Sequence, residues 1–317
     1  MIGGEFEIGR IPSGGAVLPG AYASGRAALY QILRSLGAPA TLWLPSWICS
    51  SVVEAAVKAG WKVAHYSLTE TMEACLESVE ARKGDAILVV NYFGMVDCGP
   101  QIRALREAFP GITLIEDDVQ AYYAFASGSE APYSFTSLRK CFAVPDGGLA
   151  RSSAPLPEAG CENTFAALKV EGAQLKAGRT PQTDDKVYLA LLEEGERRID
   201  LEYDAAMSAS GAALWQAVDK EEVARRRLAN ASLLQEGLRA MGVKPILEPT
   251  QGQVPLFLPI LSEKRDQLRR HLFAHEVYSP VHWPGTDLGG RELSLICDQR
   301  YGAEDMELIL TLTDDIL

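Results

Sequence analysis

The chain has 317 residues, of which 47% are hydrophobic and 23% charged, an ordinary composition for a globular protein. Its formal net charge of −12 argues against a duplex-binding surface, because phosphate contacts need clustered Lys and Arg. No apolar run is long enough to span a bilayer, and the acidic start does not match a secretory signal. We therefore expect a cytoplasmic protein whose six cysteines are reduced.

The first two-thirds of the chain alternate between short apolar runs and helical patterns. We expect strands at 41–44, 61–68, 86–93, 113–117, 133–138 and 147–152. We expect helices at 25–36, 48–59, 69–82 and 100–109. A glycine follows each helix, as is common at a helix C-terminus. Strands and helices in alternation predict an α/β fold with a largely parallel sheet.

The pattern changes after residue 155. Residues 155–183 contain several prolines and glycines and are predicted to form a loop, and polar helices are expected at 184–207 and 218–241. The last quarter predicts strands at 254–261, 277–283 and 292–297, and helices at 262–274 and 303–312. We expect a large domain over residues 1–210 and a small α+β domain over residues 211–317.

Two polar clusters lie on predicted helices. Arg225, Arg226 and Arg227 form the one dense basic cluster, and a solvated or ion-paired helix face is expected there. His271 and His275 are four residues apart, but the surrounding sequence is not a metalloprotease motif. No metal site is predicted.

Ser24 and Gly25 open the helix predicted at 25–36. A Ser-Gly step there directs free backbone N–H groups and the positive helix end towards the space before the helix, where a phosphate would fit. Ser24 is equally a routine N-cap. The chain has no G-x-G-x-x-G and no G-x-x-x-x-G-K-[ST] motif, so neither a dinucleotide nor a nucleoside triphosphate is indicated.

Three consecutive acids, Glu116, Asp117 and Asp118, end the apolar strand predicted at 113–117. Ligands collect at the carboxyl ends of parallel strands, and a poorly hydrated carboxylate there needs a positive partner. The alternative is a solvated turn in which Asp118 caps a helix. Trp47, in the turn after the strand at 41–44, is either a core residue or a stacking face for a planar ligand.

Lys140 lies in SFTSLRKCFAVPDGG (134–148), among apolar residues and before a glycine pair. With the Ser-Gly step, the turn aromatic and the strand-end acid, it completes what pyridoxal phosphate needs: a phosphate cup, a stacking face, a counter-ion for the ring nitrogen and an amine for the aldehyde. Such an amine also acts as a general base when substrate displaces it from the aldehyde.

These segments resemble the fold type I, DegT-type family of pyridoxal-phosphate aminotransferases, many of which aminate keto-sugars attached to nucleotides. The resemblance is carried by ASGRAAL (23–29), LPSWICSSVVEAAVKAGWKVAHYSL (44–68), IEDDVQA (115–121) and the lysine segment. It implies an α/β, fold type I pyridoxal-phosphate-dependent transferase with a large, mostly parallel sheet domain and a small C-terminal α+β domain.

The resemblance also implies roles for single residues toward the cofactor. Lys140 would bind the cofactor aldehyde covalently and move protons. Asp117 would pair with the pyridine nitrogen, Gln120 would reach the ring hydroxyl and Trp47 would stack on the ring. The residues expected to line the phosphate are Ser24, Gly25, Arg26 and Ser137.

Other residues are candidates for contact with cofactor or substrate. Asn91 and Tyr92 either touch these ligands or simply pack, and in the small domain His282 and Arg300 either touch substrate or are structural. Arg26 stands where the family usually has Thr. The family's G-x-N-x-R-M segment, which helps complete the neighbouring subunit's site, is not found, and EGAQLKAGRTPQTDDKVYLALL lies in its place.

We expect an aminotransferase that moves an amino group from glutamate or glutamine to a nucleotide-linked keto-sugar or to a similar carbonyl compound. Such a reaction would belong to polysaccharide or antibiotic sugar biosynthesis. The rivals are another pyridoxal-phosphate reaction, such as a lyase or dehydratase, and a non-catalytic cofactor-binding oligomer. Retention of Lys140 argues against the sugar dehydratases of this fold that carry histidine there. A homodimer is expected, with small-molecule substrates and with neither nucleic acid nor membrane as partner.

Overall fold

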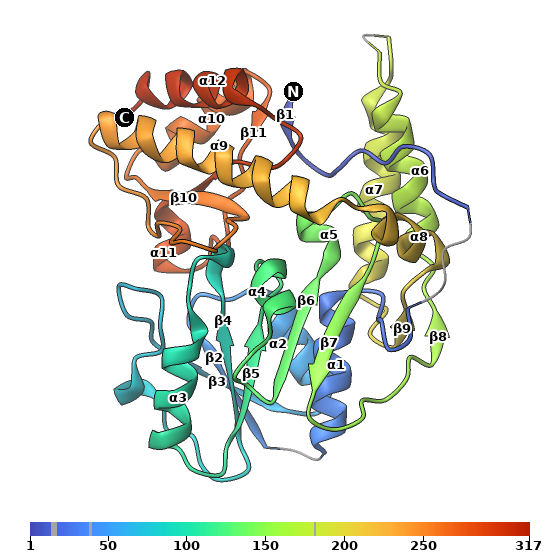
Figure 1. The fold of residues 1–317 in the computed structure, drawn as a ribbon, viewed down its shortest axis with the longest axis vertical. Helices are drawn as coiled ribbons and strands as arrows, with labels where there is room; N and C mark the ends of the chain where they lie inside the picture. The colour runs from blue at the N-terminus through green and yellow to red at the C-terminus, as the bar shows by residue number, and fades with distance from the viewer. Residues whose placement is uncertain (14–17, 38–39, 181) are drawn as a thin grey trace.

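The computed structural model describes residues 1–13, 18–37, 40–180 and 182–317 (Figure 1). Its central sheet has the strand order β3-β2-β4-β5-β6-β7, in which β7 is antiparallel to β6 and the other pairs are parallel. The strands are β2 (Thr41–Pro45), β3 (Lys62–Tyr66), β4 (Ala86–Val90), β5 (Thr113–Asp117), β6 (Tyr133–Ser137) and β7 (Gly148–Ser152). The predicted α/β fold with a largely parallel sheet is confirmed.

The helices of the large unit are α1 (Gly25–Leu36), α2 (Ser50–Lys58), α3 (Cys98–Ala108), α4 (Tyr122–Ser127) and α5 (Leu138–Cys141). The helix predicted at 69–82 is wrong, because only the short 3-10 turn η1 (Leu76–Ser78) forms there. The Thr69 hydroxyl accepts a hydrogen bond from the Glu73 backbone N–H and so competes with helical pairing. The strand predicted at 86–93 ends at Val90, and the 3-10 turn η2 (Tyr92–Gly94) follows, with Phe93 at φ 56°.

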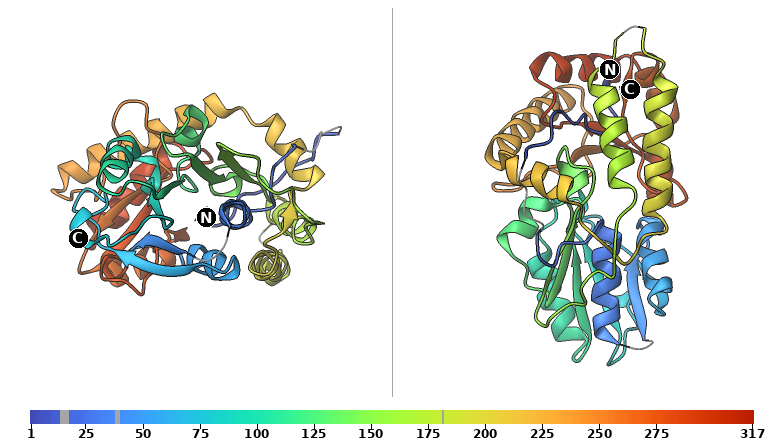
Figure 2. Two further views of the ribbon diagram at one scale, coloured as in Figure 1. Left: turned by 90° about the horizontal axis from the view of Figure 1, so that it is seen from below. Right: turned by 90° about the vertical axis from the view of Figure 1, so that its right-hand side faces the viewer.

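Helix α6 (Ala166–Ala177) forms within the loop predicted at 155–183, and it packs in a hairpin against α7 (Asp185–Ile199), which lies in the helix predicted at 184–207 (Figure 2). The loop prediction is wrong because Gly172 is a packing residue. A Cβ at position 172 would lie 3.0 Å from Leu192, so the absent side chain lets the two helices approach. The predicted helix at 184–207 ends at Ile199, and the short strands β8 (Cys161–Glu162) and β9 (Ala205–Ala206) pair beside it.

The C-terminal unit contains two small sheets. β10 (Phe257–Leu261) is antiparallel to β12 (Glu292–Ile296), and β1 (Ile2–Gly3) is parallel to β11 (Val277–Tyr278). Its helices are α9 (Lys220–Ala240), α10 (Arg265–Ala274), α11 (Asp287–Arg291) and α12 (Ala303–Asp314), preceded by α8 (Ala209–Ala217). Because β1 pairs with β11, the chain begins in the C-terminal unit and then crosses to the large unit (Figure 1).

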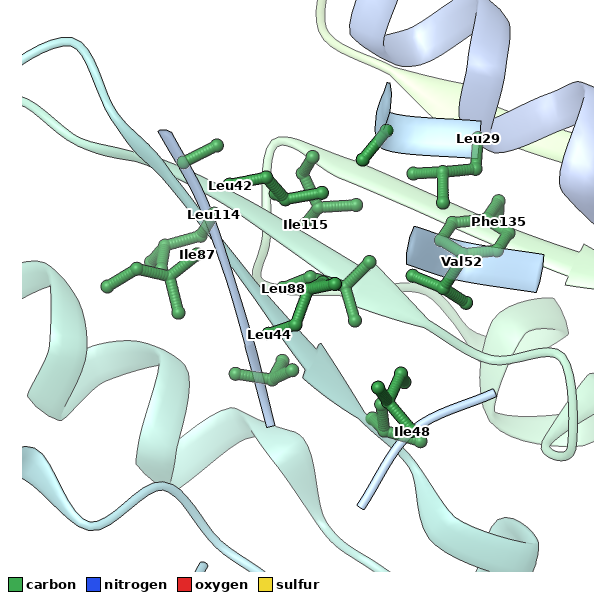
Figure 3. Packing of buried hydrophobic residues seen from close by; sticks show 14 of the residues in the cluster. Leu29, Leu42, Leu44, Ile48, Val52, Ile87, Leu88, Leu114, Ile115 and Phe135 are labelled. Carbon is green, nitrogen blue, oxygen red and sulfur yellow. The ribbon is translucent and has the colours of Figure 1, made fainter. Parts of the chain in front are cut away.

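The main hydrophobic core surrounds the central sheet (Figure 3). Leu88 and Ile115 of the inner strands are fully buried, and Leu29 of α1 packs near Phe135. Each such side chain contributes about 1.5–3 kcal/mol by leaving water. A second cluster fills the C-terminal unit and includes Ile2. In the described part of the chain, no helix is both long and apolar enough to cross a membrane. All six cysteines are free thiols.

Candidate active site

A cavity of about 600 Å³ lies between the carboxyl ends of the central strands and the C-terminal unit. This volume is typical of small-molecule sites. Among the described residues, six basic and four acidic side chains line it, although the protein as a whole carries a net charge of −12. The basic residues are Arg26, Arg139, Lys140, Lys169, Arg227 and Arg300, and the acidic ones are Glu5, Asp117, Glu196 and Asp298. Ion pairs neutralise several of these basic groups, but the lining contains more basic than acidic side chains, which favours an anionic ligand.

Lys140 reaches this cavity from α5, the single turn that follows β6. Its side chain is accessible to solvent through the cavity, while protein surrounds it on its other sides. This desolvation, and next the charge of Arg139, lower the pKa of Lys140, while Glu196 acts in the opposite direction. A lowered pKa increases the fraction of neutral amine, the form that attacks an aldehyde.

Asp117 ends β5 and lines the same cavity as Lys140. Its side chain is 5% exposed, and its Oδ1 accepts a hydrogen bond of 2.9 Å from the Val119 N–H. Burial raises the pKa of Asp117 to about 7, and the nearby charge of Lys140 works against that rise. A cationic ligand group in the cavity would stabilise the ionised form of Asp117 and so lower this pKa.

The neighbouring acids are buried as well. Glu116 pairs with the Ser129 hydroxyl, and burial raises the pKa of both Glu116 and Asp118. The solvated-turn alternative is therefore wrong, and the residue at the N-cap of α4 is Ala121 rather than Asp118.

The predicted phosphate residues Ser24, Gly25 and Ser137 come together at the start of α1. The Ser24 hydroxyl accepts a hydrogen bond of 3.1 Å from the Ala27 N–H, so Ser24 is the N-cap. A Cβ on Gly25 would lie 3.2 Å from Ser137 Cβ, which shows how closely α1 approaches the end of β6. All three residues line the cavity.

The glycine pair after Lys140 allows this approach. Gly147 has φ +116°, a conformation that favours glycine. A Cβ on Gly148 would lie 1.9 Å from the Ser24 carbonyl oxygen, so no other residue fits there without movement of the backbone. The lysine segment and the Ser-Gly step are thus held together by backbone contact.

Arg26 also lines the cavity, but its guanidinium is engaged elsewhere. Nη1 donates to Asp200 Oδ1 at 2.6 Å, and the group lies over the Tyr203 ring at 5.8 Å from its centroid. The side chain therefore connects α1 to the end of α7.

Gln120 lines the cavity, and its Oε1 accepts a hydrogen bond of 2.9 Å from the Phe93 N–H. Trp47, Asn91 and Tyr92 are not among the described residues that line it. Trp47 is 1% exposed, and its ring stacks on Tyr92 with centroids 5.2 Å apart.

The other contacts of these residues are internal too. Trp47 meets the edge of Trp283 with a centroid separation of 4.8 Å, and its Nε1 donates to the His282 carbonyl at 3.3 Å. Asn91 Oδ1 accepts a hydrogen bond of 3.1 Å from the Val96 N–H. In this geometry Trp47, Asn91 and Tyr92 pack as core residues, and their roles toward a ligand stay predictions.

His282 and Arg300 reach the cavity from the C-terminal unit. His282 Nδ1 lies 3.1 Å from Ser294 Oγ and 3.4 Å from Glu292 Oε1. Arg300 directs its nitrogens to protein oxygens: those of Asp298, Glu7, Glu5 and Gly4. Its five N–H groups are thereby in use, which argues against Arg300 as a free receptor for a substrate anion.

One wall of the cavity was not predicted. Glu5 of the N-terminal segment, Lys169 of α6, Glu196 of α7 and Arg139 form a chain of ion pairs. Lys169 Nζ lies 2.6 Å from Glu5 Oε1, and the Lys169 side chain is 2% exposed. Burial alone would raise the pKa of Glu196, but Arg139 and Lys169 lower it to about 2.

Gly195 leaves room for this buried lysine, because a Cβ there would lie 2.9 Å from Lys169 Cε. The sequence prediction missed the wall because residues 155–183 were expected to be a loop. The only local signal was the position of Arg139 beside Lys140.

The groups in the cavity fit pyridoxal phosphate. The start of α1 offers backbone N–H groups and serine hydroxyls where a phosphate would lie. The Asp117 carboxyl, with its raised pKa, can stabilise a protonated ring nitrogen, and the Lys140 amine can bond to an aldehyde.

Comparison with known proteins agrees with this chemistry. The model of the DegT/DnrJ/EryC1/StrS aminotransferase family matches residues 20–288. No curated protein matches the chain. Among the solved structures that share the fold are three aminotransferases.

The first is an aminotransferase of this family from Brucella abortus, at 19% identity and TM-score 0.64, covering 93% of this chain and 84% of that one. The second is a putative sugar aminotransferase from Streptococcus pneumoniae in its PMP form, at 16% identity and TM-score 0.68, covering 94% and 88%. The third is a sugar aminotransferase from Micromonospora echinospora, at 16% identity and TM-score 0.64, covering 93% and 86%. The chain therefore belongs to the DegT/DnrJ/EryC1/StrS aminotransferase family and is a fold type I aminotransferase with pyridoxal phosphate as its cofactor.

Proposed function

We propose that the protein transfers an amino group from glutamate or glutamine to a nucleotide-linked keto-sugar. The observation that carries the proposal is that the Lys140 amine and the Asp117 carboxyl share one cavity whose charged lining is mainly basic. The carboxylate of an amino acid and the phosphates of a nucleotide-linked sugar are both anions that such a lining attracts. The likeness to sugar aminotransferases supports a sugar as the acceptor.

Each residue has a defined task in this proposal. Bound pyridoxal phosphate supplies an electron sink for the carbon that loses or gains the amino group. Lys140 binds the cofactor and, once substrate displaces it, carries the proton to and from that carbon. Asp117 balances the charge of the ring nitrogen. Ser24, Gly25 and Ser137 orient the phosphate, so the reacting carbon is held near Lys140.

We also propose that the protein is a cytoplasmic homodimer. The hairpin of α6 and α7 stands where the family carries the segment that reaches the neighbouring subunit. Its exposed apolar side chains include Leu175, Val187 and Leu189. Light scattering after size-exclusion chromatography measures the mass directly, and a monomer at micromolar concentration would contradict this part of the proposal.

Transfer of labelled nitrogen tests the function. The purified protein with added cofactor is incubated with ¹⁵N-glutamate, or with glutamine labelled at its α-amino group, and with nucleotide-linked keto-sugars, and the sugar product is analysed by mass spectrometry. We expect ¹⁵N in the product with wild type and with Lys186→Ala, an exposed lysine, but none with Lys140→Ala. Conversion of the sugar without ¹⁵N would favour a lyase or dehydratase, and equal transfer by Lys140→Ala would refute the role of Lys140.

A further inference from the structure

The three arginines of α9 have different environments. Arg225 and Arg226 form ion pairs with Glu222 on the surface, as expected from the sequence. Arg227 is 1% exposed, so the prediction of a solvated or ion-paired face is wrong for this residue. Its side chain points away from solvent, towards the large unit.

Arg227 donates to backbone carbonyl groups from two separate parts of the chain. Nη1 lies 2.9 Å from the Leu256 carbonyl oxygen and 3.4 Å from that of Pro255. Nη2 lies 3.3 Å from the Cys141 carbonyl oxygen, which also accepts a hydrogen bond of 3.0 Å from Gln299 Nε2. In Figure 1, α9 accordingly passes above α5.

The shared acceptor, Cys141, is the last residue of α5 and follows Lys140 directly. The last carbonyl groups of a helix receive no hydrogen bond from within the helix, so their donors must come from elsewhere. Here the donors come from α9 and from the segment after β12, both in the C-terminal unit. The turn that carries Lys140 is therefore held at its end by the other unit.

A buried guanidinium is costly unless its N–H groups are satisfied, and an apolar side chain often replaces a buried charge without loss of stability. In the described structure, the hydrogen bonds of Arg227 go to carbonyl groups. Arginine suits this position better than lysine, because its planar guanidinium holds several N–H groups in a fixed fork that can reach two chain segments at once.

We propose that Arg227 is a positioning residue for Lys140: by binding the Cys141 carbonyl it fixes the end of α5 and so sets where the Lys140 amine stands in the cavity. The inference rests on the proposed role of Lys140. Arg227 acts through the backbone, since both of its Nη atoms donate to main-chain oxygens, whereas its buried Nε has no hydrogen-bond partner among the described atoms. Gln299 supports the same carbonyl from a second side.

The experiment measures how fast Lys140 bonds to added pyridoxal phosphate. Samples are quenched with borohydride at set times, and the fraction of modified Lys140 peptide is quantified by mass spectrometry. We expect Arg227→Met, with circular dichroism like wild type, to react about 10- to 100-fold more slowly, because small displacements of a reacting group have effects of this size. Arg225→Met, a surface arginine of the same helix whose hydrogen bonds go to Glu222, is the matched control and should react at the wild-type rate.

Two milder variants keep the test decisive if Arg227→Met does not fold. Arg227→Lys keeps the charge but loses the fork, and Gln299→Leu removes the second donor, so both should react more slowly than wild type. Wild-type rates for folded Arg227→Met, or for both milder variants, would overturn the positioning role. A wild-type protein in which Lys140 is never modified would instead refute the proposed function, so the two failures are distinguishable.

Discussion

Lys140 and Asp117 face one cavity, close enough for the lysine charge to oppose the rise in the pKa of the acid. The amine comes from the turn after β6 and the acid from the end of β5, and these two strands are neighbours in the sheet. The sheet therefore brings an amine and a carboxyl group to one cavity, where they would serve as nucleophile and counter-ion for a bound cofactor.

The raised pKa of Asp117 predicts that the free energy of unfolding of the cofactor-free protein depends on pH. An unfolded aspartate titrates near pH ~4, whereas Asp117 in the folded protein has a pKa of about 7. Between these values the folded state binds more protons, so stability falls as pH rises from about 4 to about 7 and is then level. Asn at position 117 does not titrate. Urea denaturation should show Asp117→Asn more stable than wild type by on the order of a few kcal/mol at pH 8, with a smaller difference at pH 5.

Asp314→Asn, at an exposed position on α12, controls for the loss of one surface charge and should show no such difference. The same Asp117→Asn protein should bind pyridoxal phosphate more weakly than wild type, as titrated by absorbance. An equal gain in stability at both pH values would mean that Asp117 in the cofactor-free protein is already ionised at pH 5, which contradicts a pKa of about 7.

Gly148→Ala should disturb the phosphate site that we expect at the start of α1. The new Cβ would lie 1.9 Å from the Ser24 carbonyl oxygen, so the backbone of one segment must move. We expect a loss of about 2–4 kcal/mol in the free energy of unfolding and weaker cofactor binding. Gly9→Ala, where no atom lies within 4 Å of the added Cβ, should change neither quantity.

Arg300→Gln should release the N-terminal segment rather than abolish substrate binding. Arg300 donates to the Gly4 and Glu5 carbonyl groups and to Glu7, and its guanidinium lies 4.5 Å from the centroid of the Phe6 ring. Hydrogen exchange should report faster exchange at the N-terminal residues. If exchange there is unchanged while the KM for the amino donor rises at least tenfold, Arg300 is a substrate residue after all.

The sequence was sufficient to predict much of the fold. The six strands of the central sheet are short apolar runs bounded by turn residues, and all six were predicted close to their observed positions. Helix α6 was missed because Gly172 and Gly178 read as loop residues, although the missing side chain of Gly172 makes room for Leu192 of α7. A glycine that allows close packing is indistinguishable from one that ends a helix until its neighbours are known.

The site was predictable where its residues adjoin strand ends or the start of α1. Asp117, Ser137 and Lys140 follow or end strands, and the topology of a parallel sheet brings such positions to one edge. Glu5, Lys169 and Arg227 come from distant segments, and only tertiary contacts place them at the cavity. Trp47 shows the limit of the pattern, since a turn aromatic suits both a core and a ring-stacking role.

The most direct test of the account is the site of covalent cofactor attachment. Wild-type protein with pyridoxal phosphate is reduced with borohydride, digested and mapped by tandem mass spectrometry. We expect a single modified peptide, with the cofactor mass on Lys140, and no cofactor mass on the buried Lys169. A reduced holoenzyme that carries the label on another lysine while Lys140 is unmodified would contradict this expectation.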